Sequence, residues 1–174
     1  MTRFAGRLAE VRLAVMMLTR LPVGHLQDSA PTLAAARWAY PLVGLIVGLI
    51  AWGIHSAIMC IGAGPTLAAV VTLGSVILTT GAMHQDGLAD FAGVLALILC
   101  CAVWISALSQ LAGQAGILSF LAIGVLSRIA MTICSATLPV ARTDGLGVLS
   151  SGGDANWILC AGLACAAVVL LGWQ

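Results

Sequence analysis

The chain has 174 residues, of which 61% are hydrophobic and only 7% carry a formal charge. Soluble domains carry roughly 25% charged residues, so this chain has too few charges to cover a water-facing surface. The composition therefore excludes a soluble globular protein, and a net charge of +1 gives no reason to expect a nucleic-acid partner.

The first predicted element is an amphipathic helix over residues 3–21. Its apolar side chains recur at spacings of three or four, as Phe4, Leu8, Val11, Val15 and Leu18. A helix of this kind that also carries arginines lies in the membrane interface rather than across the membrane. Pro22 and Gly24 are expected to end it, and residues 25–37 are polar enough for a loop or a short re-entrant segment.

Five apolar runs then predict five membrane spans. They lie near residues 38–61, 66–83, 92–111, 117–138 and 157–173. The second run is short of the roughly 20 residues that a spanning helix needs, so we expect it to continue into the polar motif that follows it. The predicted fold class is an all-α, polytopic transmembrane helix bundle, which forms one integral membrane domain over residues 1–174.

The first span contains two further signals. Gly44 and Gly48 form a G-x-x-x-G pair, which is typical of a helix face that packs closely against another helix. His55 lies toward the end of the same run. We expect this histidine to be packed or interfacial rather than catalytic, because it lies far from the arginine-rich end of the span.

The arginines predict the orientation of the bundle. The positive-inside rule places residues 1–37 in the cytoplasm, and five spans return residues 81–91 and 139–156 to the same side. The loops at 62–65 and 112–116 contain no charge. Every formal charge except that of Arg128 then lies on the cytoplasmic side, which supports five spans.

The candidate chemistry centres on the polar stretch 80–90, between two apolar runs. Asp86 and Asp90 are four residues apart, so on a helix both carboxylates project from one face. Two carboxylates completed by substrate phosphates suit Mg²⁺, although a solvated helix end explains the same spacing. Gly87 between them would allow a bulky substrate to approach the backbone closely.

Three other polar residues are candidates, each with a simpler alternative. His84 could act as a base, a ligand or a phosphate contact, or it could bond the backbone at the interface. Arg128 lies well inside a span, where an arginine usually faces a carboxylate or an anionic substrate. Arg142 lies in the polar turn 142–147 and either contacts an anion or belongs to an ordinary positive loop.

The segment 80–90 resembles the T-G-A-x-H-x-D-G-L-A-D signature of the cobalamin synthase family, the adenosylcobinamide-GDP ribazoletransferases. Three other segments are similar to elements of that family, in the expected order. They are the T-R-L-P element within residues 18–23, the start of the first span at 40–45, and the S-R and A-R-x-x-G-L-G pair at 127–128 and 141–147. The similar segments together span about residues 15–150.

The resemblance implies a magnesium-dependent, multi-pass enzyme of the bacterial inner membrane with its catalytic face in the cytoplasm. The expected reaction joins α-ribazole, or its 5′-phosphate, to adenosylcobinamide-GDP and releases GMP. By the resemblance Asp86 and Asp90 hold Mg²⁺, while His84, Arg128 and Arg142 contact phosphates or handle protons. Membrane lipid is an expected partner, and a homo-oligomer is left open.

The chain also departs from the family pattern. After the motif, Phe91 to Leu97 lead directly into the next apolar run, where family members have a charged cytoplasmic arm with further acidic and arginine residues. The carboxy-terminal G-D-x-x-G-A-x-x-E element of the family is also absent before Gln174. The chain is thus expected to be either a shortened relative or a sequence from which residues are missing, and several acids of the family site are absent from it in both cases.

Two other function classes fit part of the pattern. A CDP-alcohol phosphotransferase-like lipid enzyme would also use clustered aspartates and Mg²⁺, but its D-G-x-x-A-R motif with further spaced aspartates is absent. A small transporter or scaffold subunit would place Arg128 along a path through the membrane. No internal repeat supports that interpretation, whereas many transporters are built from paired halves.

Overall fold

A computed structural model describes residues 3–26, 31–111, 114, 116–139, 148–149 and 162. The regular elements there are all helical: α1 (Arg3–Leu18), α2 (Leu33–Ala36), η1 (Arg37–Ala39), α3 (Tyr40–Cys60), α4 (Pro65–Thr80), α5 (Met83–Gln110) and α6 (Ile117–Thr137). Leu33–Cys60, Met83–Gln110 and Ile117–Thr137 are long and apolar enough to cross a membrane, and α4 is a shorter apolar helix. The all-α membrane fold is confirmed, while the expected span at 157–173 lies outside the described residues.

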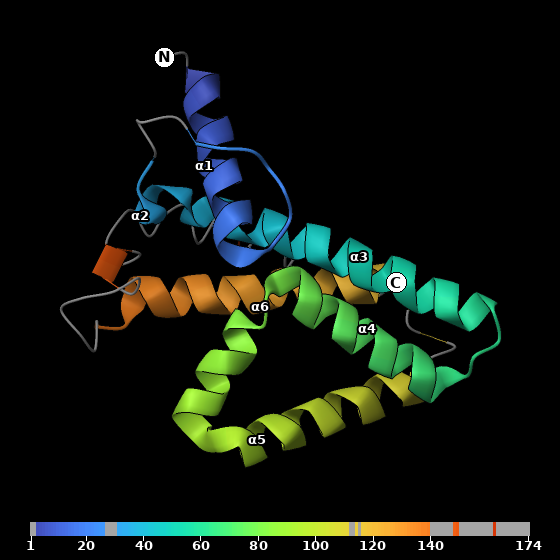
Figure 1. Cartoon of the computed structure of the whole chain (residues 1–174). Coiled ribbons are helices and arrows are strands. Elements are labelled where there is room, and N and C mark those ends of the chain that lie inside the picture. Colours follow the sequence, from blue (N-terminus) through green and yellow to red (C-terminus); the bar gives the residue numbers. More distant parts are fainter. Residues whose placement is uncertain are drawn as a thin grey trace.

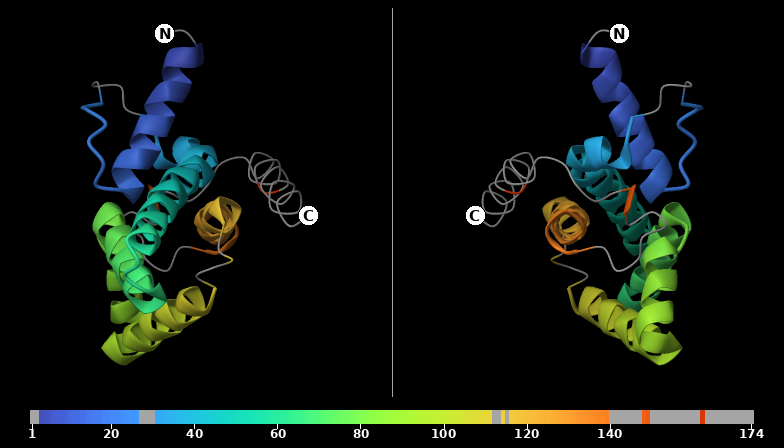
Figure 2. Two further views of the ribbon diagram at one scale, coloured as in Figure 1. Left: turned by 90° about the vertical axis from the view of Figure 1, so that its right-hand side faces the viewer. Right: turned by 90° about the vertical axis from the view of Figure 1, so that its left-hand side faces the viewer.

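The centre of the bundle is the pair α3 and α6, which lie side by side and make the most extensive helix contact (Figure 1). Helix α4 packs along α3, and α5 follows α4 in the chain and packs against it. Seen end-on, α1 and α5 lie on opposite sides of the central pair (Figure 2). The second half of α5 exposes a row of large apolar side chains, which suits contact with lipid: Val94, Leu95, Ile98, Leu99 and Val103.

Glycines form the contact between α3 and α6. A Cβ added to Gly44 would lie 2.7 Å from the carbonyl carbon of Gly124 on α6. One added to Gly48 would lie 2.6 Å from the carbonyl oxygen of Phe120. The two backbones therefore touch with no side chain between them. The close packing expected of the G-x-x-x-G pair is confirmed, and its partner surface on α6 includes Phe120 and Gly124.

We expect Gly44→Ala to destabilise the protein by about 1–3 kcal/mol, because the added methyl forces two packed backbones apart. Gly53→Ala is the matched control on the same helix, since a Cβ there meets no atom within 4 Å. Alanine also has a higher helix propensity than glycine, so the control should be neutral or stabilising. Thermal unfolding in detergent measures both variants, and equal midpoints would contradict the contact.

The helical path into α3 begins earlier than the predicted first span. Thr32 caps α2 through its hydroxyl, which accepts a hydrogen bond from the N–H of Ala35 at 3.2 Å. The chain continues through η1 into α3, so the helical path begins at Leu33 rather than near Trp38. Burial explains the difference, because Ala36 and Arg37 pack against the rest of the protein instead of facing water.

The amino-terminal helix α1 ends at Leu18 and lies across the start of α3. Its residues Ala14, Val15 and Leu18 are buried against the first turns of α3. Polar contacts add to this packing one to two turns earlier: the indole N–H of Trp38 donates to Glu10, which also pairs with Arg7 at 2.9 Å. This packing fixes where the segment after Leu18 leaves the helix.

The connection between α4 and α5 reverses the chain. Gly81 (φ 70°) and Ala82 (φ 61°) are both left-handed, and α5 begins at Met83. Two consecutive left-handed residues cannot continue an α-helix, so α4 ends at Thr80 instead of running on into the motif. A second break follows at Gly93 (φ 83°), where α5 bends and its second half returns toward the start of α6 (Figure 1).

Candidate functional site

Two segments far apart in sequence meet at the turn between α4 and α5. The backbone N–H of Arg20 donates to the carbonyl oxygen of Thr79 at 2.8 Å. The Arg20 side chain covers Gly81, where an added Cβ would lie 2.5 Å from Nε. The T-R-L-P element near the amino terminus is therefore placed against the T-G-A start of the motif. This contact was not anticipated from the sequence, where the element was noted without a role.

The motif residues after the turn lie on the first part of α5. His84, Asp86, Gly87 and Asp90 are all exposed to solvent. The helical spacing of Asp86 and Asp90 places their carboxylates along one face, as expected. A Cβ added at Gly87 would meet no atom within 4 Å, so the backbone between the two acids is open to a ligand.

Arg128 lies on the inner face of α6. Only 9% of its surface is exposed. Its Nη1 donates to the hydroxyl of Ser127 at 2.8 Å, and that hydroxyl donates to the carbonyl oxygen of Gly124 at 2.9 Å. Ser127 thus links Arg128 to Gly124, one of the residues at which α6 touches α3.

The charge of Arg128 has no acidic partner in the described part of the chain. Its Nε is buried without a hydrogen-bond partner there, and its guanidinium forms no ion pair with a described carboxylate. A buried guanidinium is costly to leave unpaired, so the site is suited to an anion.

A metal at this site would depend on the two carboxylates of α5. The described residues contain no cluster of three or more histidine, cysteine or acidic side chains. Asp86 and Asp90 are nevertheless exposed, and neither forms an ion pair with a described residue. Magnesium commonly takes one or two protein carboxylates and fills its remaining positions with water and phosphate, so this pair fits that ion.

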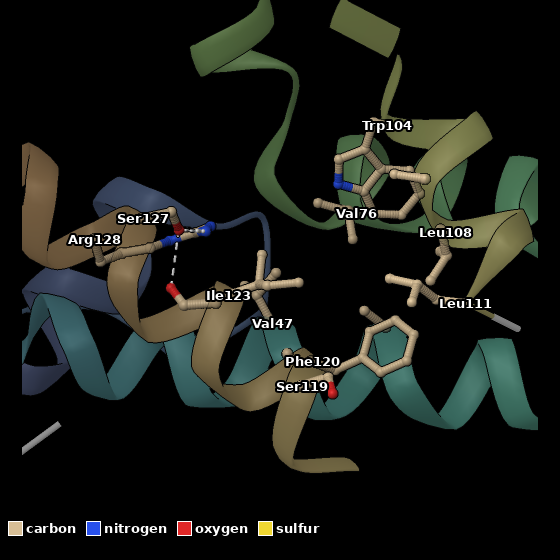
Figure 3. Close-up of a pocket in the computed structure, with 14 residues that line it drawn as sticks. Val47, Val76, Trp104, Leu108, Leu111, Ser119, Phe120, Ile123, Ser127 and Arg128 are labelled. Carbon is tan, nitrogen blue, oxygen red and sulfur yellow. Dashed lines mark hydrogen bonds between the residues drawn. The ribbon is translucent and has the colours of Figure 1, made fainter. Parts of the chain in front are cut away.

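A cavity of about 300 Å³ lies among α3, α4, α5 and α6, next to Arg128 (Figure 3). Most of its lining is apolar. Trp104, Leu108 and Phe120 line one end, and Ser127 and Arg128 lie at the other. The cavity shows that the inner face of α6 at Arg128 is not filled by neighbouring side chains.

His55 does not belong to this site. It lies on α3, is 2% exposed and contacts residues of α4 and α6. Its Nδ1 lies 3.4 Å from the Thr72 hydroxyl, and its ring is 5.2 Å from that of Phe120. The expectation of a packed histidine is confirmed. Arg142, the remaining candidate, lies outside the described residues.

Comparison with known proteins identifies related chains. The family model described as cobalamin-5-phosphate synthase matches residues 10–92 and 91–173. An adenosylcobinamide-GDP ribazoletransferase of Bradyrhizobium diazoefficiens is 33% identical over 80% of this chain and 64% of the relative. Proteins of the same name are 30% identical in Mesorhizobium japonicum (95% of this chain, 78% of the relative) and 35% identical in Chlorobaculum tepidum (92% and 73%). No solved structure matches the chain.

The comparisons also locate a difference in length. The two matched segments meet at residues 91–92, directly after the motif. The alignment with the Mesorhizobium japonicum protein runs over 203 positions, which exceeds the 174 residues of this chain. The relative therefore has residues that this chain lacks. The break in the match indicates that they belong after Asp90, where the sequence predicted the loss of an arm.

Proposed function

The chain belongs to the cobalamin-5-phosphate synthase family, and from that premise we propose that it is an adenosylcobinamide-GDP ribazoletransferase. The proposed substrates are adenosylcobinamide-GDP and α-ribazole or its 5′-phosphate. The observation that best supports the proposal is the contact of Arg20 with Gly81, in the turn directly before the part of α5 that carries His84, Asp86 and Asp90. Arginines and carboxylates that form no ion pair with a described residue suit a reaction on a diphosphate.

The proposed reaction is a transfer at phosphorus. A ribose hydroxyl oxygen of α-ribazole attacks the phosphorus that carries the cobinamide, and a new phosphorus–oxygen bond forms. The bond from that phosphorus to the bridging oxygen of the diphosphate breaks, and GMP leaves with the bonding electrons. The hydroxyl proton must pass to a base, and we assign this role to His84, because imidazole is the commonest such base near neutral pH.

The remaining roles follow from charge. Arg128 would hold a phosphate oxygen with its planar set of N–H donors, and Ser127 would fix the direction of that guanidinium. Asp86 and Asp90 would hold Mg²⁺, which supplies charge neutralisation to the diphosphate and the leaving GMP. The exposure of both carboxylates and the open backbone at Gly87 support this assignment.

We place the reaction at the cytoplasmic face of the bacterial inner membrane. The arginine-rich segment at the amino terminus and the motif turn lie at the same end of the bundle, because Arg20 contacts both Thr79 and Gly81. The positive-inside rule assigns such an end to the cytoplasm. A cysteine introduced at Gly87 should thus react only with reagents that enter the cell.

The activity is tested with the purified protein in detergent or lipid vesicles. Adenosylcobinamide-GDP and α-ribazole, or its phosphate, are supplied with Mg²⁺ or with a chelator. We expect GMP and the joined cobamide in equal amounts, and neither product when the chelator is present. Absence of GMP from a folded sample with both acceptors would overturn the proposed function.

A further inference from the structure

The segment that follows α1, residues 19–23, is firmly held on both sides of Arg20. The hydroxyl of Thr19 donates to the carbonyl oxygen of Val15 at 2.8 Å and accepts from the N–H of Leu21 at 3.2 Å. Leu21 and Val23 pack against the core formed by α1 and α3. Together with the backbone bond from Arg20 to Thr79, these contacts fix the point from which the arginine side chain starts.

The course of the Arg20 side chain depends on a glycine. Its Cγ, Cδ and Nε would lie 3.1, 3.2 and 2.5 Å from a Cβ on Gly81. Any side chain at position 81 would therefore displace the arginine. The absence of a side chain brings the guanidinium to the turn from which α5 and its acidic residues begin.

Neither burial of the side chain nor an ion pair explains why an arginine occupies position 20. Its side chain is exposed and forms no ion pair with a carboxylate in the described ranges. A guanidinium with no carboxylate partner among the described residues can bind an anion, and a diphosphate offers several oxygens to guanidinium groups.

We propose that Arg20 binds the diphosphate of adenosylcobinamide-GDP, with Gly81 as the residue that positions it. The inference rests on the proposed function for the identity of the nucleotide. It adds a binding residue from the amino-terminal segment to a site otherwise built by α5 and α6. Nucleoside diphosphates as a class should therefore compete for Arg20.

Binding and turnover of Arg20→Gln are compared with those of Arg12→Gln, an exposed arginine on α1, as the matched control. Loss of a charge-assisted hydrogen bond predicts a rise of about 10- to 100-fold in the KM for adenosylcobinamide-GDP. The KM for α-ribazole and the melting temperature should stay as in the control. Arg20→Lys should be intermediate, and Gly81→Ala should reproduce the KM effect.

A binding measurement separates this inference from the proposed function. The Kd for GDP, measured by calorimetry without turnover, should rise in Arg20→Gln by the same factor as the KM. If the wild-type protein binds GDP without catalysing transfer, the proposed function fails while Arg20 is still tested. The inference is overturned if Arg20→Gln binds GDP as tightly as Arg12→Gln, or if the wild-type protein does not bind GDP.

Discussion

Replacing Asp86 with asparagine is expected to lower kcat by about two to three orders of magnitude, since metal assistance to charge development is worth several kcal/mol. Asparagine keeps the shape of the side chain but removes one of the two charges that would hold Mg²⁺. The residual activity should need a higher Mg²⁺ concentration. Initial rates over a magnesium titration, with GMP as the measured product, give both quantities.

The stability of the Asp86→Asn protein should not fall, because the substitution relieves repulsion from Asp90 one turn away. Glu10→Gln is the contrasting control. Glu10 pairs with Arg7 and accepts from Trp38, so its loss should weaken the attachment of α1 and leave the magnesium dependence unchanged. An Asp86→Asn enzyme with wild-type rates at low Mg²⁺ would remove this residue from the metal site.

Replacing Arg128 with methionine is expected to abolish most of the activity without loss of stability. A preorganised cation that contacts the reacting phosphate contributes about 100-fold or more to the rate. The same guanidinium is buried with an unpartnered Nε in the described structure, so an apolar side chain of similar length removes a desolvation cost. The melting temperature should therefore stay constant or rise.

Two further variants show whether a loss of activity in Arg128→Met comes from the lost guanidinium. Arg128→Lys keeps the charge but loses the planar set of donors, so its activity should lie between those of wild type and Arg128→Met. Ser135→Ala lies on the same helix and removes only a hydroxyl that donates to the Thr132 carbonyl at 3.0 Å. It should keep full activity. A large fall in the melting temperature of Arg128→Met would instead identify the arginine as part of the fold.

Sequence patterns predicted the features that depend on residues close together in the chain. The apolar runs identified the helices, and the spacing of Gly44 and Gly48 predicted a close helix contact that the structure confirms. Only the structure shows that Gly124 is the partner, because no local signal pairs residues from different helices. The same holds for Arg20, whose bond to Thr79 joins segments separated by three helices.

The differences from expectation have physical causes. The motif was expected to extend the second span, yet Gly81 and Ala82 adopt left-handed conformations that end α4. Alanine rarely adopts a positive φ, so the presence of alanine at position 82 did not indicate a left-handed turn there. Residues 25–37 were expected to form a loop or a short re-entrant segment, whereas the structure has helical residues from Leu33 onward, with Ala36 and Arg37 buried.

The break at Gly93 has a consequence for how the family varies. Its φ of 83° already interrupts the hydrogen-bonded path of α5, and the two matches to the family model meet only one or two residues before it. The two halves of α5 are thus joined where added length disturbs no helix. A segment taken from a longer relative could therefore be inserted between Phe91 and Gly93 while α3, α4 and α6 keep their packing. Exchange of such arms would separate what the bundle contributes to the chemistry from what the arm contributes.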